Sequence, residues 1–359
     1  MATLTEVHRS LGATFEERAG RPVVRDYGSP DRAGRAVRDG VGVTEQPVDV
    51  VEVTGADAVE YVDNVVSNRV PAEPGWGCYA LLCDPKGRIE TDLYAVTTEG
   101  SVRLFLPPGR GERTVAGWEV FIQDVAFDVP AERDVVLGLH GPASAAALAA
   151  ALEAADPPTD PLAAVEGRLA GASATVVRAD APLGEVGFWV NAAAEDAGAV
   201  LAALVDGDPA AVPFGGQVFD ALALEAGTPR FEADLAGHLP NDAGVRNGLD
   251  FAKGCYVGQE VVSRIENRGR PSHHLVGLRP GACPAAGAAV LDDGEVVGAV
   301  TRAAEGPTVG GPVALAYVPP DVGDELEVEF DDGAVPARRV PLPFVEGSER
   351  SARLPRYPE

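Results

Sequence analysis

The segment from Pro271 to Phe344 restricts the fold more than any other part of the sequence. It holds about six short runs of the apolar and β-branched residues typical of strands, namely HLVGL, AAVL, EVVGAVT, PVALAYV, ELEVEF and ARRV. Asp-Asp-Gly turns at 292–294 and 331–333 join neighbouring runs. So many short strands in so short a segment predict a small β-barrel or a β-sandwich.

The region before Pro271 mixes helices and strands. Residues 48–53 (VDVVEV) predict a strand, and Gly55 and Asp57 open a short helix. The apolar face of that helix is formed by Val59, Val62, Val65 and Val66. Three apolar runs follow, YALLC, IETDLYAV and VRLFLP, and the turn signals DPKG and TTEG between them predict paired strands.

Helices and strands go on alternating further along the chain. VVLGLHG predicts a strand followed by an alanine-rich helix over 143–155, and ATVVRA and GFWVN predict two more strands. Asn191 is a candidate N-cap of the next helix, and Gly227 closes a helix predicted for GGQVFDALALEAG. This uneven alternation favours the α+β class over a doubly wound parallel sheet.

The sequence also predicts the structure of the two ends of the chain. Val7, Leu11 and Phe15 recur at helical spacing, so residues 1–27 predict a helix and a loop. We expect the tail after Val345 to be mobile.

The formal net charge of −26 excludes several classes of partner. It argues against binding to nucleic acid or to an anionic membrane surface, and it is typical of a salt-adapted protein. No window reaches 18 apolar residues and the start lacks the apolar stretch of a signal peptide, so we expect a cytoplasmic protein. Four cysteines without a CxxC pair predict neither a disulfide framework nor a structural metal site.

Positive charge is concentrated in one segment. Between Arg246 and Arg279, six Arg or Lys residues stand against three acids, a net charge of +3. This cationic segment either binds an anionic ligand or partner, or pairs with the protein's own acids. It contains Lys253, which with Lys86 makes up all the lysine of the chain. Lys253 could favour the thiolate of Cys255 and make it reactive, and a small buried cysteine in a tight turn is the alternative.

Acidic residues in two segments are candidates for ligand binding. If Ile89 to Tyr94 is a strand, Glu90, Asp92 and Tyr94 share one face, and a carboxylate beside an aromatic ring can hold an amine or an aromatic heterocycle. Glu185 lies just before an apolar strand and could accept hydrogen bonds from ring N–H groups. The alternatives are the solvent face of a hairpin and a surface glutamate at a turn.

Together these segments resemble the family of the glycine-cleavage T-protein (aminomethyltransferase) and the YgfZ-type folate-binding proteins. Lys-Gly-Cys-Tyr-Val-Gly-Gln-Glu at 253–260, followed by Arg264, is similar to the signature of the YgfZ branch. The resemblance covers nearly the whole chain, and further matching stretches are H-x-x-x-G-A-x-F at the start, GADAVEYVDNVVSN, FDALALEAGTPRFEADL, LPNDAG and the run from GAVTRAA to VPLPFV.

The resemblance implies a three-lobed α+β fold around a central cavity for tetrahydrofolate. Two α+β lobes would lie within residues 1–268, one of them with a ferredoxin-like split βαβ unit and one discontinuous. A six-stranded β-barrel would span residues 269–345, followed by a tail at 346–359.

The resemblance also implies residue roles. Asp92 matches the aspartate beside the reactive nitrogen of folate, and Cys255 matches the cysteine of the YgfZ signature, so these two are the candidate catalytic residues. Glu185, in L-G-E-x-G-F, matches a glutamate that holds the pterin ring. The candidate folate-binding residues are Tyr79, Asp92, Tyr94, Glu185, Lys253 and Arg264.

Two positions depart from the T-protein pattern. Ala223 stands where T-proteins carry a folate-contacting arginine, and the stretch 87–92 has lost one glycine and one aspartate. Arg88 or Arg230 could supply the missing charge. The resemblance therefore implies a protein that binds folate, single or polyglutamylated, and supports iron–sulfur cluster assembly or repair in client proteins. Folate-dependent aminomethyl transfer and a scaffold that has lost folate are the alternatives.

Overall fold

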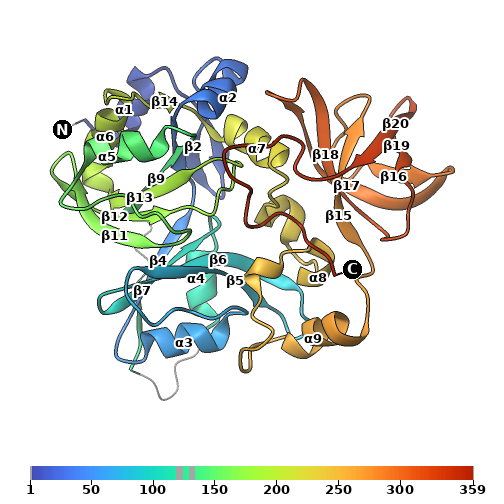
Figure 1. Cartoon of the computed structure of the whole chain (residues 1–359), viewed down its shortest axis with the longest axis horizontal. Helices are drawn as coiled ribbons and strands as arrows, with labels where there is room; N and C mark the ends of the chain where they lie inside the picture. Colours follow the sequence, from blue (N-terminus) through green and yellow to red (C-terminus); the bar gives the residue numbers. More distant parts are fainter. Residues whose placement is uncertain (1, 119–123, 129–133, 359) are drawn as a thin grey trace.

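A computed structural model describes residues 2–118, 124–128 and 134–358, which form three lobes (Figure 1). Two lobes are built on open sheets and the third is a closed barrel. Short helices and the C-terminal tail run between them (Figure 1). The expected α+β class with a six-stranded C-terminal barrel is confirmed.

The first lobe is a seven-stranded sheet of order β10-β11-β12-β13-β9-β3-β14, preceded by a separate hairpin of β1 and β2. The strands are β1 (Thr14–Arg18), β2 (Arg21–Asp26), β3 (Gly42–Gln46), β9 (Asp134–His140), β10 (Leu152–Glu153), β11 (Ala164–Leu169), β12 (Ala172–Arg178), β13 (Gly187–Ala193) and β14 (Val212–Pro213). The helices are α1 (Leu4–Ser10), α2 (Pro30–Asp39), α5 (Ser144–Ala151) and α6 (Ala194–Val205). Apolar side chains of α5 and α6 form one buried core with this sheet.

The second lobe is a five-stranded sheet of order β5-β6-β7-β4-β8. Its elements are β4 (Asp49–Thr54), α3 (Ala58–Val65), β5 (Trp76–Cys83), β6 (Ile89–Thr98), β7 (Ser101–Leu106), α4 (Gly111–Ala116) and β8 (Ala126–Asp128). Side chains alternate along β5, so that Cys78 and Ala80 pack with α3 while Tyr79 and Leu81 face the centre of the molecule.

The third lobe is the barrel that the sequence predicted after Pro271. Its strands are β15 (His274–Pro280), β16 (Ala289–Asp292), β17 (Glu295–Gly306), β18 (Gly311–Val318), β19 (Glu325–Phe330) and β20 (Gly333–Val340). Pairing of β15 with β20 closes the barrel. Its interior is filled mainly by valine, leucine and alanine.

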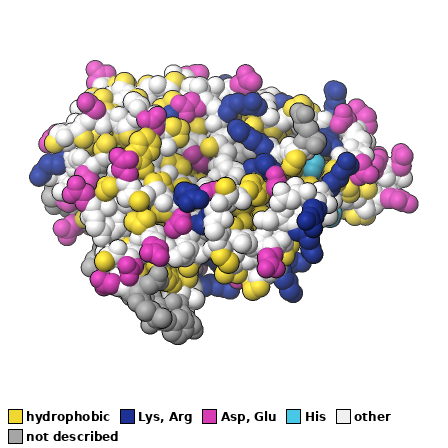
Figure 2. Space-filling view, turned by 60° about the horizontal axis from the view of Figure 1, so that its bottom comes forward, with side chains coloured by type: hydrophobic (Ala, Val, Ile, Leu, Met, Phe, Trp, Pro, Cys, Tyr) yellow, Lys and Arg dark blue, Asp and Glu magenta, His cyan; other side chains and the backbone are white. Residues whose placement is uncertain are grey.

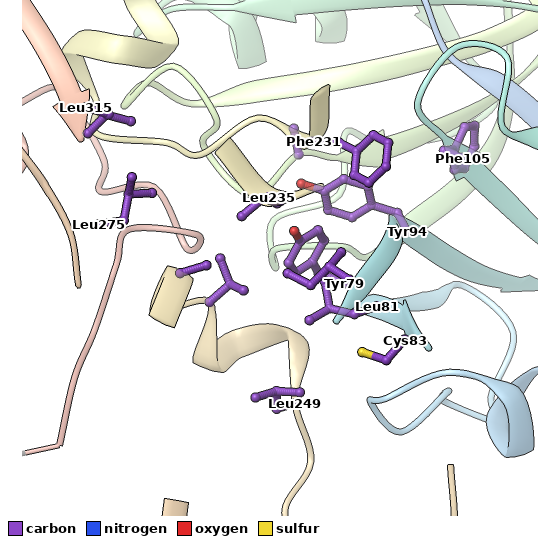
Figure 3. Close-up of a cluster of buried hydrophobic side chains, with 14 of the residues drawn as sticks. Tyr79, Leu81, Cys83, Tyr94, Phe105, Phe231, Leu235, Leu249, Leu275 and Leu315 are labelled. Atoms are coloured by element: carbon purple, nitrogen blue, oxygen red, sulfur yellow. The ribbon is translucent and has the colours of Figure 1, made fainter. Parts of the chain in front are cut away.

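A shared core joins the three lobes. The connecting elements are α7 (Gly216–Glu225), the π-helical turn η1 (Phe231–Leu235), α8 (Pro240–Ala243), the 3-10 turn η2 (Arg246–Gly248) and α9 (Gln259–Arg268). Figure 3 shows side chains from β5, β6, η1 and the barrel converging in this core, among them Tyr79, Tyr94, Phe231, Leu235 and Leu275. Within the described ranges, no helix is long and apolar enough to cross a membrane.

Three predictions for the first lobe differ from the structure. Residues 14–26 form the β1–β2 hairpin, because Gly12 ends the α1 turn at a φ of +86° and sends the chain back. Asn191 does not cap a helix, because it lies within β13. Its side chain accepts a hydrogen bond from Arg103 at 3.1 Å and donates one to the Val135 carbonyl at 3.3 Å. The alanine-rich helix also ends earlier than expected, at Ala151, where β10 pairs with β11.

The expectation of a mobile tail is also wrong. Ser351 and Leu354 are buried, and the backbone N–H of Ala352 donates to the carbonyl of Asp180 at 3.1 Å. Near the end, Arg356 N–H donates to the carbonyl of Gly244 at 2.9 Å. The tail therefore returns from the barrel to the space between the lobes, as Figure 1 shows.

Candidate functional site

Two buried carboxylates and two buried tyrosines meet at the centre of the molecule. The hydroxyl of Tyr79 on β5 donates to Oδ2 of Asp92 on β6 at 2.9 Å. The hydroxyl of Tyr94, also on β6, donates to Oδ2 of Asp180 at 2.8 Å. The two tyrosine rings lie 5.1 Å apart (Figure 3). Asp92 and Tyr94 thus lie together on β6 as predicted, whereas Glu90, expected on the same face, is exposed and does not line this centre.

The tail supplies the positive charge for this group. Arg353 Nη1 lies 3.8 Å from Asp92 Oδ2, and Arg353 Nε lies 3.4 Å from Asp180 Oδ2. The guanidinium carbon is also 5.5 Å from the ring centroids of both Tyr79 and Tyr94. Since buried carboxylates are costly without a partner, Arg353 stabilises the whole cluster.

The environment shifts the acidity of these side chains. Burial raises the pKa of Asp92, and although Arg353 and the Tyr79 hydrogen bond act in the opposite direction, the net shift is upward. Burial also raises the pKa of Tyr79 and of Tyr94 well above the ordinary value, so both remain hydrogen-bond donors. Asp92 is therefore a carboxyl group suited to exchange a proton with a ligand.

A cavity of about 110 Å³ adjoins the cluster. Its lining includes Asp92, Arg353 and the aromatic side chains of Tyr94, Phe105, Trp189 and Phe231. Two polar atoms of lining residues, Trp189 Nε1 and Thr228 Oγ1, are buried without a hydrogen-bond partner in the described part of the chain. A flat heterocycle with polar edges suits such a lining.

Arginines surround one side of the cavity. A neighbouring cleft of about 380 Å³ shares Arg18, Arg230 and Glu232 with the cavity and is also lined by Arg302. Arg230 forms an ion pair with Asp220, whose Oδ2 also lies 2.9 Å from Arg18 Nη2. Burial lowers the pKa of Arg230 to about 10, which still leaves it charged at neutral pH. Arg302 Nη2 lies 3.1 Å from Asp234 Oδ2, so an anionic group on this side would share these arginines with the protein's own carboxylates.

Glu185 lies in a different environment from Asp92. It is buried, and its Oε1 lies 3.2 Å from Arg38 Nη1. Its Oε2 accepts hydrogen bonds from Ser348, at 3.0 Å from the backbone N–H and 2.5 Å from the hydroxyl. Glu185 thus anchors the tail and is absent from the lining of the cavity.

Two family models match most of the chain. A family model described as the GCVT N-terminal domain matches residues 4–253, and a second, the glycine cleavage T-protein C-terminal barrel domain, matches residues 273–346. The chain belongs to the glycine cleavage T-protein family.

Individual T-protein relatives resemble the chain over almost its full length. The aminomethyltransferase of Streptomyces coelicolor is 32% identical and covers 95% of this chain and 96% of its own. That of Bacillus subtilis is 26% identical and covers 95% and 98%. The crystal structure of glycine cleavage system aminomethyltransferase T from Bartonella henselae matches with a TM-score of 0.86 at 26% identity, covering 97% and 98%.

One departure from the T-protein pattern is visible in the cavity. Ala223 lines it from α7, at the position that corresponds to the folate-contacting arginine of the T-protein pattern. Of the two candidate replacements, Arg230 lines the cavity, whereas Arg88 is exposed and lies outside the lining.

The YgfZ-like signature at residues 253–264 lies outside the lining of the central cavity. Lys253 Nζ donates to the carbonyl of Asn68 at 2.8 Å and lies 3.1 Å from Asp63 Oδ1. The ammonium is therefore held by the segment around α3, in contrast to the expected pairing with the thiol of Cys255. Cys255 is exposed, as is Arg264 on α9, and none of these three signature residues lines the cavity.

The structure shows one of the two alternatives for part of the cationic segment, namely pairing with the protein's own acids. Lys253 and Arg246 pair with the protein's own acids, the latter with Glu266 at 2.6 Å. Arg264, Arg268 and Arg270 are exposed on and after α9. Figure 2 shows Lys and Arg side chains gathered on part of the face that carries this helix.

Sequence reasoning missed several residues of the central cavity, namely Arg353, Trp189, Thr228 and Phe231. Trp189 could have been found from its place in the strand GFWVN, two residues after Gly187. Arg353 gave no local signal, because its role depends on how the tail folds back. Among the described residues, no group of three or more His, Cys, Asp or Glu side chains is arranged to hold a metal ion.

Proposed function

We propose that this chain is a folate-dependent aminomethyltransferase, which passes a one-carbon unit from an aminomethylated carrier to tetrahydrofolate. The observation that carries the proposal is the buried Asp92, hydrogen-bonded to Tyr79 and open to an aromatic-lined cavity. Relatives named aminomethyltransferase, 26% and 32% identical over nearly the full chain, support it.

In this proposal the residues of the chain bind and orient the reactants. Asp92 accepts a hydrogen bond from a folate N–H group, and its raised pKa suits it to exchange a proton there. Tyr79 fixes the orientation of the carboxyl group, and Phe231 and Trp189 pack against the ring system. Positioning of this kind contributes about a few kcal/mol to lowering the barrier.

The polar and aromatic lining of the cavity suits folate, but the volume of the cavity is small for it. Trp189 Nε1 and Thr228 Oγ1 would gain partners from the polar edges of a pterin. The cavity of about 110 Å³ is smaller than the ~300–1,000 Å³ of most ligand pockets, so folate would have to move lining side chains apart. Arg18, Arg230 and Arg302 are candidates to receive the anionic glutamate tail, single or polyglutamylated.

Glu185 can hold the pterin ring in this proposal only if its present contacts change. Both of its oxygens have partners, Arg38 on one and Ser348 on the other. It would hold a pterin ring only if Ser348 gave up its two hydrogen bonds.

The test is turnover by the purified full chain. Aminomethylated carrier protein and tetrahydrofolate are supplied in molar KCl, and formation of methylene-tetrahydrofolate is measured. Asp92→Asn is expected to lower kcat about a hundredfold or more. Glu90→Gln, an exposed acid on the same strand, is the matched control. No turnover by the wild-type chain at saturating folate would refute the proposal.

A second candidate function rests on the surface loop that carries Cys255. In the YgfZ-like reading, the protein binds tetrahydrofolate and supports iron–sulfur enzymes, with Cys255 facing a client or assembly protein. Its exposure, next to the exposed Phe251 and Val257, favours contact with a partner.

Two variants test this second reading in the host. Cys255→Ala is expected to lower the activity of iron–sulfur enzymes, whereas Cys283→Ala, also exposed and free, is expected to leave it unchanged. Normal enzyme activity in the Cys255 variant, alongside a defect in the deletion strain, would remove Cys255 from the mechanism. Titration with tetrahydrofolate addresses the remaining possibility, since a scaffold that has lost folate would bind none at millimolar ligand.

A further inference from the structure

A buried histidine connects the rim of the molecule to the wall of the central cavity. His8 on α1 is 1% exposed. Its Nε2 lies 3.0 Å from Oε2 of Glu45 on β3, and its Nδ1 lies 2.7 Å from the hydroxyl of Tyr27, which follows β2. Glu45 lines the cavity and Tyr27 is partly exposed. The three side chains thus form an unbroken hydrogen-bonded chain between the cavity and the outside.

The motif H-x-x-x-G-A-x-F near the start of the sequence holds this histidine in place. Gly12, at a φ of +86°, turns the chain after α1, and the N–H of Ala13 donates to the carbonyl of His8 at 3.0 Å. The turn brings Phe15 edge-on to the imidazole, with ring centroids 6.4 Å apart. The motif therefore fixes a ring orientation that the proposed folate contacts do not use.

We infer that Glu45 exchanges protons with the ligand in the central cavity, and that His8 and Tyr27 connect it to solvent. The inference rests on the proposed function. Aminomethyl transfer replaces two N–H bonds of the acceptor by N–C bonds, and the departing amine and the carrier sulfur each take up a proton, so protons must both leave and enter the site. An imidazole suits such a path, because it takes a proton at one ring nitrogen while giving one up at the other.

The proton balance along the chain closes over one turnover. At the start, the Tyr27 hydroxyl donates to Nδ1 of His8, and Nε2–H donates to the Glu45 carboxylate. When the amine departs, the Nε2 proton passes through Glu45 to the amine, the Tyr27 hydroxyl proton moves to Nδ1, and water reprotonates Tyr27. When the acceptor nitrogen then loses its proton, Glu45 passes that proton to Nε2, Nδ1 returns its proton to the Tyr27 oxygen, and the Tyr27 hydroxyl proton passes to water. One proton enters and one leaves, the second acceptor proton goes to the carrier sulfur, and the imidazole ends in its starting tautomer.

The surroundings distinguish Glu45 from the other carboxylates of the cavity. Asp92, which meets the folate N–H group in the proposed function, is buried against Tyr79 and Arg353. Glu45 has a side chain that is 27% exposed and a hydrogen-bonded route outward. The other charged groups that line the cavity are Arg18, Asp92, Arg230, Glu232 and Arg353.

Two variants in the turnover assay test the inference. Glu45→Gln keeps an oxygen that accepts from His8 Nε2–H but cannot take up a proton. We expect its kcat to fall about a hundredfold, with the KM for tetrahydrofolate within about twofold of wild type. Tyr27→Phe removes only the outer hydroxyl, and we expect about a tenfold loss of kcat and a changed solvent deuterium isotope effect.

Controls separate this path from a structural role and from the proposed function. Tyr61→Phe, in the core with Trp118 and Phe127, is expected to keep wild-type kcat and isotope effect. A Glu45→Gln enzyme within twofold of wild-type kcat, or one changed only in KM, overturns the inference while the proposed function stands. An inactive wild-type chain overturns both.

Discussion

Replacing Arg353 with methionine tests whether the buried carboxylates depend on the tail. Methionine keeps an unbranched stem against Tyr79 and Tyr94 but removes the charge that lies 3.8 Å from Asp92 and 3.4 Å from Asp180. Asp92 and Asp180 are 5% and 3% exposed, so water cannot readily replace the arginine. Breaking a buried ion pair by removing one partner typically costs about 3–5 kcal/mol.

The loss has an upper limit, because a carboxylate without a partner can take up a proton. Neutralising an ordinary carboxyl group at pH 7 spans about three pK units at about 1.4 kcal/mol each, or about 4 kcal/mol. We therefore expect Arg353→Met to lower the free energy of unfolding by about 3–4 kcal/mol at pH 7.

The destabilisation caused by Arg353→Met should become smaller as the pH falls. Burial already raises the pKa of Asp92, and removal of Arg353 raises it further. An acid whose pKa is raised by folding destabilises the protein above that pKa, and the penalty disappears as the pH falls toward the unfolded value. The deficit of the variant should therefore shrink between pH 7 and pH 5, by up to about 1.4 kcal/mol per pH unit.

The assay is urea unfolding in molar KCl, followed by circular dichroism at pH 7 and pH 5. Arg350→Met is the matched control, because Arg350 belongs to the same tail and its side chain is exposed. It should change the free energy of unfolding by less than about 0.5 kcal/mol. A loss below about 1 kcal/mol for Arg353→Met, or an equal loss at both pH values, would refute the reasoning.

Three further predictions concern stability. Lys253→Arg should lower the free energy of unfolding by about 1–3 kcal/mol, because a larger planar group must fit where the 2% exposed side chain of Lys253 contacts Asp63 and Asn68. Lys86→Arg, at an exposed position, should leave the melting temperature unchanged. Burial, aided by the charge of Arg178, lowers the pKa of His140 to about 3, so folding stability should fall as the pH drops below about 6.5. His140→Phe should remove about 3 kcal/mol of that loss between pH 7 and pH 4.5, and unchanged acid sensitivity in urea titrations would contradict this. Gly347→Ala should destabilise the docked tail by about 1–3 kcal/mol, since a Cβ there would overlap the carbonyl oxygen of Gly184; a melting temperature equal to that of wild type would argue against the tight contact.

The sequence predicted best the elements whose patterns are local. The barrel strands and the β5–β6–β7 meander carry their own alternation and turn signals, so their pairing could be read without the rest of the chain. Asp92 and Tyr94 could be placed together for the same reason, since both lie on β6.

The errors arose where tertiary contacts decide the outcome. Val7, Leu11 and Phe15 fit a helix by spacing, yet the turn at Gly12 places Phe15 in a strand against His8. Asn191 looked like a cap because polar residues favour that position, but Arg103 and the backbone of β9 hold it within the sheet. Arg353 could not be found because neither carboxylate that it contacts lies near it in sequence.

The docked tail has a consequence for the order in which the chain can assemble. Asp92 and Asp180 are made long before Arg353, and the cavity lining runs from Arg18 to Arg353. Because a nascent chain folds from its N-terminal side, the two open-sheet lobes would pass through a stage in which these acids stay hydrated. The burial of Asp92 and Asp180 is then a late event in biosynthesis, because it requires the guanidinium of Arg353 in the C-terminal tail.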